Sequence, residues 1–219
     1  MVFRISPHMS SHPALLAATD LEARRGRRSL FRALSFALEP GRALLVSGRN
    51  GSGKTTLLRT LCGLTRPERG VVSWRGRPIG AQRDEYNAEL VYLGHASALK
   101  DDLTAEENLV TSMSLSVRIG AGEARRALAE AGLDSCARLP AKLLSQGQRR
   151  RVALTRLCLA RARPLWILDE PFVGLDAEAA DALRNLLAAH LDAGGSLVFT
   201  THQEIEIAPD RTTRVALDS

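Results

Sequence analysis

The residues with the clearest chemical signal lie between Ala43 and Leu64. The segment from Gly48 to Thr55, GRNGSGKT, matches the pattern G-x-x-x-x-G-K-[ST] that surrounds phosphate groups. A short apolar run precedes this segment, and leucines recur at helical spacing after it. Because a strand, a glycine-rich loop and a helix follow one another in this order, the sequence predicts a triphosphate site.

The residue types in this loop suit a triphosphate. Glycines let backbone N–H groups approach the phosphate oxygens, and the helix N-terminus adds unpaired N–H groups and a partial positive charge. We expect Lys54 to reach the β- and γ-phosphates and the Thr55 hydroxyl to hold Mg²⁺. The residues predicted to bind the nucleotide here are Gly48, Arg49, Asn50, Gly51, Ser52, Gly53, Lys54, Thr55 and Thr56.

Two carboxylates follow a second apolar run, which extends from Leu165 to Leu168. Ligands of open α/β sheets bind at the carboxyl ends of the strands, where the chain turns and both side chains can face one site. We expect Asp169 to hold Mg²⁺ and Glu170 to orient and deprotonate the attacking water. Taken alone, the acid pair could equally be a solvated strand end, but the upstream phosphate loop favours the catalytic interpretation.

A third group, LSQGQ, precedes a long helical pattern. Ser145 and the Gly147 amide stand where a helix N-terminus can meet a phosphate. A second such helix end is redundant in a monomer. It becomes useful if it faces the nucleotide held by another copy of the chain.

Composition and charge narrow the class of protein. The 219 residues are 45% hydrophobic and 25% charged, which is ordinary for a globular chain. The net charge of +6 comes mainly from arginine and suits phosphate ligands or an anionic membrane face, so we do not interpret it as nucleic-acid binding. The three cysteines, Cys62, Cys136 and Cys158, form no CxxC pair, so neither a zinc site nor a disulfide framework is expected.

The chain changes character twice. After residues 1–13, for which we expect a flexible tail, short apolar runs and turn signals predict a β-rich part around one helix. Residues from about 96 to 160 are typical of a helical insert, where Thr104 and Glu107 predict a capping box. From Leu165 on, strands and helices alternate, which predicts an α/β fold with a parallel sheet. No apolar run approaches the roughly 18 residues that span a bilayer, so work at a membrane would require recruitment by another chain.

Five motifs together resemble those of the ATP-binding subunits of ABC transporters, in the family's order. They are GRNGSGKTT (Walker A), LSQGQ (signature), LWILDEP (Walker B with the catalytic glutamate), GLD (D-loop) and Thr201-His202 (H-loop). The resemblance implies one nucleotide-binding domain over residues 14–219. It would consist of a P-loop, RecA-like core at 14–94 and 161–219 with an antiparallel β-subdomain, and of a helical signature subdomain at about 95–160.

The resemblance also implies how the site works. Two copies would pair head to tail and hold two ATP molecules between the Walker A loop of one and the signature of the other. Lys54, Glu170 and His202 would be catalytic, with His202 at the γ-phosphate, and Asp176 would cross the interface. Ser145, Gly147 and Gln148 would bind the nucleotide of the other copy, and Thr55, Asp169 and His95 would hold Mg²⁺.

Two positions depart from the family's pattern. Where most members carry an aromatic residue that stacks on adenine, this chain has Arg24 and Arg25, and an arginine plane can also stack on a base. Where most members have a glutamine after the LVYL strand, this chain has His95. Its neutral imidazole can accept a hydrogen bond or ligate a metal, and a loop histidine without a ligand role is the alternative.

Within the family, the segment from Tyr92 to Leu109, together with LSQGQRRRVAL, PLWILDEPF and TTHQ, is similar to the ATPase of the haem exporter of bacterial cytochrome c maturation. This resemblance implies a peripheral protein on the cytoplasmic face of the inner membrane. Its partners would be integral membrane permease subunits and, indirectly, a periplasmic haem chaperone. We expect the segment from His95 to Leu109 to receive a cytoplasmic helix of the permease.

ATP hydrolysis would then drive haem export or the release of the haem-loaded chaperone. An ABC exporter for another substrate is the alternative that stays open. ABC ATPases that act on nucleic acid usually carry twin cassettes or long coiled-coil insertions, and the sequence has neither.

Overall fold

The computed structural model describes residues 14–113, 119–203 and 205–217. The tail predicted for residues 1–13 lies outside these ranges. The described chain forms two compact units, which we call the core unit (up to Tyr92, Arg163–Glu170 and from Leu187 on) and the helical unit (Leu93–Ala162 and Pro171–Leu186). The segment 171–186, which the sequence places in the core, thus groups with the helical unit.

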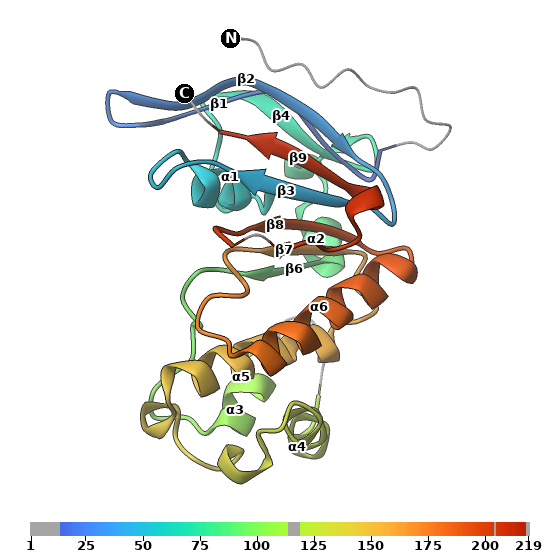
Figure 1. Cartoon of the computed structure of the whole chain (residues 1–219). Helices are drawn as coiled ribbons and strands as arrows, with labels where there is room; N and C mark the ends of the chain where they lie inside the picture. Colours follow the sequence, from blue (N-terminus) through green and yellow to red (C-terminus); the bar gives the residue numbers. More distant parts are fainter. Residues whose placement is uncertain (1–13, 114–118, 204, 218–219) are drawn as a thin grey trace. The chain divides into compact units, whose positions relative to one another are not determined.

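A five-stranded sheet lies at the centre of the core unit (Figure 1). Its strands stand in the order β6-β7-β8-β3-β9, and the pairs β7–β8, β8–β3 and β3–β9 are parallel. Every residue of β7 and β8 is buried, as expected for parallel strands covered on both faces. The strands are β3 (Ala43–Ser47), β6 (Leu90–Leu93), β7 (Leu165–Leu168), β8 (Ser196–Thr200) and β9 (Thr212–Ala216).

A separate antiparallel sheet has the order β2-β1-β4-β5. It contains β1 (Leu16–Arg25), β2 (Arg28–Leu38), β4 (Arg69–Trp74) and β5 (Arg77–Pro78). The sequence predicts only short strands near residues 15–20 and 34–38, whereas the structure extends both into one long hairpin. Gly26, with φ of 59°, lies in the turn of this hairpin. Arginines occupy both faces of the strands near the turn, so the sequence there lacks the alternation of apolar and polar residues that predicts a strand.

Helix α1 (Lys54–Leu61) contacts both sheets. Its buried Leu57, Leu58 and Leu61 share one hydrophobic cluster with residues of the antiparallel sheet and with β3, β7 and β8. The sequence patterns did not indicate helix α2 (Arg83–Glu89). A hydrogen bond joins it to α1: the buried Tyr86 hydroxyl donates to the Leu61 carbonyl at 2.7 Å. The packing therefore fixes the phosphate loop between β3 and α1.

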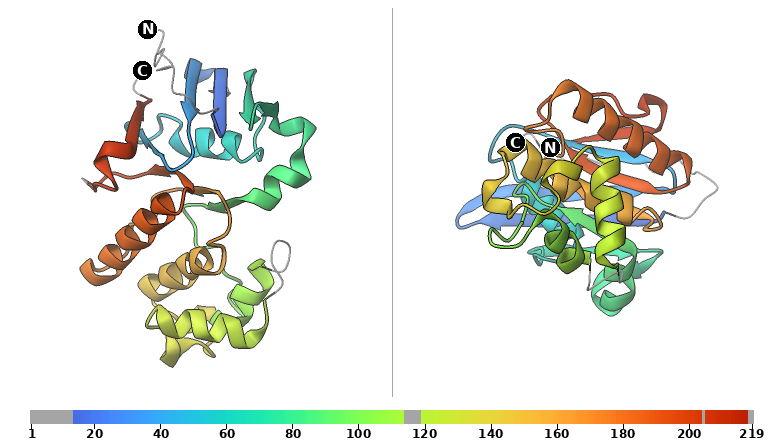
Figure 2. Two further views of the ribbon diagram at one scale, coloured as in Figure 1. Left: turned by 90° about the vertical axis from the view of Figure 1, so that its right-hand side faces the viewer. Right: turned by 90° about the horizontal axis from the view of Figure 1, so that it is seen from below.

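The helical unit contains α3 (Ala105–Met113), α4 (Ala121–Glu130) and α5 (Gln146–Leu159), which lie together in Figure 2. Buried apolar residues of these helices form a cluster of their own. The predicted capping box is confirmed: the Glu107 amide donates to the Thr104 hydroxyl at 3.1 Å, and the Thr104 amide donates to the Glu107 carboxylate at 2.8 Å. Helix α6 (Ala177–Asp192) runs through residues of both units. Short 3₁₀ turns lie at Ile79–Ala81, Asp134–Cys136, Ala141–Leu143 and Pro209–Arg211.

These elements confirm the predicted α/β fold with a parallel sheet, an antiparallel sheet and a helical part. Within the described residues, none of the helices combines the length and the apolar character that crossing a bilayer requires.

Candidate functional site

The phosphate loop closes tightly on itself. Gly48 has φ of 145°, and a Cβ added there would lie 2.6 Å from the Ser52 hydroxyl. Gly53 has φ of 108° and stands before α1; an added Cβ would lie 3.0 Å from Leu30 of β2. Both positions therefore require glycine, because a side chain would collide with the loop or with the neighbouring hairpin and would strain the backbone.

The Lys54 side chain is only 8% exposed and lies across the loop. Its Nζ donates to the carbonyl of Gly48 at 2.8 Å and to that of Arg49 at 3.4 Å. An ammonium group has three protons, so a phosphate oxygen can still accept from it. In the described structure the buried Ser52 hydroxyl has no hydrogen-bond partner. A donor aimed into a glycine-lined loop fits a bound triphosphate.

Asp169, at the end of β7 and 1% exposed, is held by two hydroxyls. Thr55 donates to one carboxylate oxygen at 2.7 Å, and Thr200 donates to the other at 2.8 Å. The pair Thr55 and Asp169 thus places a hydroxyl and a carboxylate side by side at the start of α1. Hard oxygen donors beside a phosphate loop are the ligand set that Mg²⁺ prefers.

Glu170 follows directly but faces a different neighbour. Its backbone has φ of 52°, a conformation that a non-glycine residue adopts only when its surroundings hold it there. The Glu170 amide donates to the Thr200 hydroxyl at 2.8 Å, and one carboxylate oxygen lies 3.1 Å from Nε2 of His202. The backbone turn that the sequence predicts after β7 is present.

Thr200 is the residue that the sequence patterns missed. Its hydroxyl accepts from the Glu170 amide and donates to Asp169, so it joins both acids to the end of β8. The available signal was a threonine at the end of an apolar strand, SLVFT, just before His202. That position indicates the same sheet edge as Asp169, but only the pairing of β7 with β8 shows that the residues touch.

The LSQGQ residues lie in the helical unit, at the N-terminus of α5. The exposed Ser145 accepts from the Gln148 amide at 3.1 Å, and the Gln148 side chain accepts from the Ser145 amide at 2.9 Å. Gly147 lies close to the Gly174 carbonyl; an added Cβ would be 3.3 Å from it. This end of the helix is therefore ordered by its own cap, and its approach to a nucleotide stays a prediction.

The segment after β6 is attached to α5. Carbonyls of Gly94 and His95 accept from the Arg150 guanidinium at 3.2 Å, and Asp101 pairs with Arg149 at 2.6 Å. The His95 side chain is exposed, and its predicted role toward Mg²⁺ is a proposal rather than an observation. Asp176 caps α6 by accepting from the Ala179 amide at 2.8 Å.

A search against family models matches residues 31–173 to the ABC transporter family. Several curated relatives are named "Cytochrome c biogenesis ATP-binding export protein CcmA". The relative from Dechloromonas aromatica is 49% identical over 201 residues, which cover 91% of this chain and 98% of that protein. The relative from Nitrosococcus oceani is 48% identical, covering 92% of each chain, and that from Pseudomonas aeruginosa is 46% identical, covering 92% and 99%.

Solved structures agree on the fold. A structure described as the ATP-binding subunit of an ABC transporter superposes with a TM-score of 0.76 at 28% identity, over 86% of this chain and 79% of that one. An ATP-binding cassette solved as a dimer with ADP and phosphate superposes with a TM-score of 0.74 at 22% identity, over 86% and 88%. This chain therefore belongs to the ABC transporter family, as an ATP-hydrolysing subunit of the cytochrome c biogenesis group.

Proposed function

We propose that this chain is the ATPase of an exporter for cytochrome c biogenesis, and that its ATP hydrolysis drives haem export or the release of a haem-loaded chaperone. One observation carries the proposal. The chain is 49% identical over 91% of its length to a protein named for this role, while its phosphate loop, its acid pair and His202 form one connected site.

Catalysis in this proposal divides among the residues of the core unit. Lys54 and the loop amides hold the phosphates and offset charge that develops in the transition state. Glu170, oriented by the hydrogen bond that its backbone N–H donates to the Thr200 hydroxyl and by its contact with His202, takes the proton of the attacking water. Mg²⁺, held by Thr55 and Asp169, would neutralise charge on the β- and γ-phosphate oxygens.

The helical unit supplies the other half of the proposed site. Ser145, Gly147 and Gln148 at the start of α5 would meet the γ-phosphate held by a second copy, with Asp176 near the same interface. The N-terminus of α5 supports this contact because it is partly exposed and its backbone dipole favours an anion. The hydrogen bond between the Gln148 amide and the Ser145 hydroxyl already orders this end of the helix. Since a ligand drives closure only through its preference for the closed state, the γ-phosphate gripped from both sides would close the dimer.

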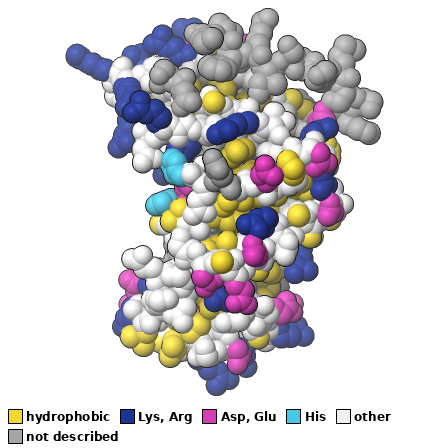
Figure 3. Space-filling model, viewed as in Figure 1, with side chains coloured by type: hydrophobic (Ala, Val, Ile, Leu, Met, Phe, Trp, Pro, Cys, Tyr) yellow, Lys and Arg dark blue, Asp and Glu magenta, His cyan; other side chains and the backbone are white. Residues whose placement is uncertain are grey.

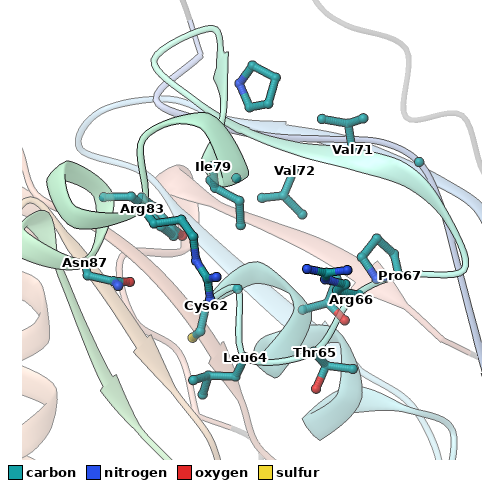
Figure 4. A pocket seen from close by; sticks show the side chains of 16 residues that line it. Cys62, Leu64, Thr65, Arg66, Pro67, Val71, Val72, Ile79, Arg83 and Asn87 are labelled. Atoms are coloured by element: carbon teal, nitrogen blue, oxygen red, sulfur yellow. The ribbon is translucent and has the colours of Figure 1, made fainter.

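A membrane partner is expected to contact the core unit at a cavity of about 310 Å³ beside α1 (Figure 4). Leu64 and Val71, which are 59% and 45% exposed, both line this cavity, so its lining includes apolar side chains that are open to solvent. Arg66 and Arg83 extend toward the same cavity. Burial raises the pKa of the Cys62 thiol at its floor, so this cysteine is apolar lining rather than a nucleophile.

We propose that this cavity of the core unit contacts an integral membrane permease subunit, and, as a separate proposal, that the segment from His95 to Leu109 of the helical unit receives a cytoplasmic helix of the permease. The chain would then sit peripherally on the cytoplasmic face of the inner membrane. Charge reversal at Asp101 is a poor test, because it would also break the pair with Arg149. The substitution Leu64→Ser with Val71→Ser is sharper, with Leu143→Ser, also exposed, as the control. Co-purification with the permease should be lost only in the first variant.

The cellular test uses a bacterium that lacks its own relative of this chain. The wild-type chain should restore covalently attached haem in periplasmic c-type cytochromes, measured by haem staining, and Glu170→Gln should not. Restoration by Glu170→Gln would refute the coupling to hydrolysis. A wild-type chain that hydrolyses ATP in the membrane but restores no cytochrome would instead identify an exporter for another substrate.

A further inference from the structure

The turn of the β1–β2 hairpin and the strand ends beside it carry five exposed arginines, and we call this segment, from Arg24 to Arg32, the hairpin end. Figure 1 shows that the hairpin end extends past β3 and α1 within the core unit, and Figure 3 shows Lys and Arg side chains gathered over it, at the upper left. The chain has no Asp or Glu from Ala23 to Leu38. The hairpin end is therefore a projecting surface of one charge. Its arginines are Arg24, Arg25, Arg27, Arg28 and Arg32.

A second run of arginines shows what is unusual about this one. On α5, Arg149, Arg150 and Arg151 each donate to an acceptor elsewhere in the helical unit, either a carboxylate or a backbone carbonyl. In the hairpin end, by contrast, none of the five arginines pairs with a carboxylate of residues 14–113, 119–203 or 205–217. The run on α5 thus serves the fold, whereas the charges of the hairpin end remain open to a partner.

The arginines of the hairpin end are unfavourable for folding. Arg25 stands directly opposite Arg28 in the strand pairing, and like charges in that position destabilise a hairpin. Strand β2 is the edge of its sheet, where charged side chains prevent pairing with another chain. That protection does not account for the arginines of β1, which is an inner strand, or for Arg27 in the turn. A negatively charged partner would relieve the repulsion.

The directions of the side chains indicate which kind of anion fits. Arg24 and Arg25 are neighbours on β1 and point to opposite faces, and Arg27 lies in the turn. Diverging cations cannot converge on one small anion, but the end of a hairpin can meet a surface that carries many negative charges. Proteins that bind single-stranded nucleic acid use exposed aromatic side chains, and the aromatic residue of the hairpin end, Phe31, is buried. A bilayer of anionic lipids requires only positive charge.

We infer that the hairpin end is a contact surface for the anionic headgroups of a phospholipid bilayer. Leu30 and Phe31, its large apolar residues, are buried, so the contact is electrostatic and stops at the headgroups. Each arginine near such a surface contributes about fivefold in affinity. The contact should weaken with salt, because the Debye length falls from about 10 Å at 0.1 M to about 3 Å at 1 M. The inference rests on membership of a transporter family and not on a role in cytochrome c biogenesis.

Sedimentation of the whole chain with vesicles that contain no permease tests the inference. The wild-type chain should bind vesicles of phosphatidylglycerol mixed with phosphatidylcholine, and should not bind vesicles of phosphatidylcholine alone. The substitution Arg27→Gln with Arg28→Gln should weaken binding on the order of twentyfold, at about fivefold for each charge. Arg27→Lys with Arg28→Lys keeps both charges and should bind as the wild-type chain does.

The matched control is Arg126→Gln with Arg161→Gln, which removes two exposed charges elsewhere on the chain and should change binding little. Far-UV circular dichroism checks that each variant is folded. Arg32→Gln, away from the turn, is a second test of the same surface, with an expected loss of about fivefold.

Three results would overturn the inference. Equal affinity for both kinds of vesicle would exclude lipid charge as the ligand. Equal losses in the Arg27/Arg28 variant and in the Arg126/Arg161 control would reduce the effect to net charge. Tighter binding of duplex DNA or RNA than of anionic vesicles at the same salt concentration would assign the surface to nucleic acid instead. None of these results bears on the exporter role, which the cytochrome assay tests separately.

Discussion

Two helix N-termini of this chain carry residues predicted to bind phosphate, and they differ in what surrounds them. At the start of α1, Lys54 is buried and donates to the Gly48 carbonyl, while the buried Asp169 accepts from the exposed Thr55 and from Thr200 at the end of the neighbouring strand β8. At the start of α5, the side chains of Ser145 and Gln148 each accept from the backbone amide of the other, and both residues lie partly exposed. The residues at the first site are thus held by the folded core unit, whereas those at the second order only their own helix end, and a nucleotide contact there stays a prediction.

The largest expected effect comes from a substitution at the site beside α1, where we propose that ATP is hydrolysed. Glu170→Gln should lower kcat by about 10²–10⁴, because the general base is lost, while ATP affinity stays near that of the wild-type chain. Phosphate release measures kcat, and equilibrium titration measures affinity. Turnover near the wild-type rate would remove Glu170 from the mechanism and would leave the core site as a binding site only.

Thr200→Val tests whether the hydrogen bonds between strands matter for chemistry. The substitution keeps the shape of the side chain but leaves the Glu170 amide and one Asp169 oxygen without their partner. We expect a loss of about 1–3 kcal/mol in the free energy of unfolding, and a drop in kcat with little change in KM. Denaturant unfolding and steady-state kinetics measure the two effects, and Thr201→Val, one residue further, is the matched control. An unchanged kcat would show that Asp169 and Glu170 keep their positions without Thr200.

The substitution Ser145→Ala tests the proposed nucleotide contact at the N-terminus of α5. Loss of the cap should cost about 1 kcal/mol in the free energy of unfolding of the helical unit. If α5 meets the nucleotide of a second copy, the variant should also lower ATP-dependent dimer formation, measured by light scattering with ATP in the Glu170→Gln background. A variant that dimerises normally and is only less stable would confine Ser145 to its capping role.

The smallest expected effect concerns acid stability and the core unit alone. His190 stacks on Trp166 with ring centroids 3.8 Å apart, and burial lowers the pKa of this histidine. The folded protein therefore binds fewer protons than the unfolded chain, so stability is intact above about pH 6.5 and falls as the pH drops below it. Both tryptophans belong to the core unit, so tryptophan fluorescence during unfolding follows this region. His190→Gln should flatten the pH dependence; an unchanged slope would assign it to other groups.

Several features were predictable because they depend on residues close in sequence. The phosphate loop requires a strand, glycines and a helix in succession, and Gly48 to Thr55 contains all of that information. The capping box of Thr104 and Glu107 likewise needs only three residues of spacing and was confirmed. Asp169 and Glu170 could be assigned because an apolar strand that ends in acids indicates a sheet edge.

Tertiary structure decided the rest. Thr200 meets Asp169 across 31 positions of sequence because β7 and β8 pair in parallel. His190 of α6 stacks on Trp166 of β7, a contact between a helix and a strand that no local pattern specifies. The sequence by itself identified the phosphate loop and the residues expected to act there, because local backbone geometry follows from residue type and spacing. Which distant side chains share a hydrogen bond depends on strand order and register, which no local pattern specifies.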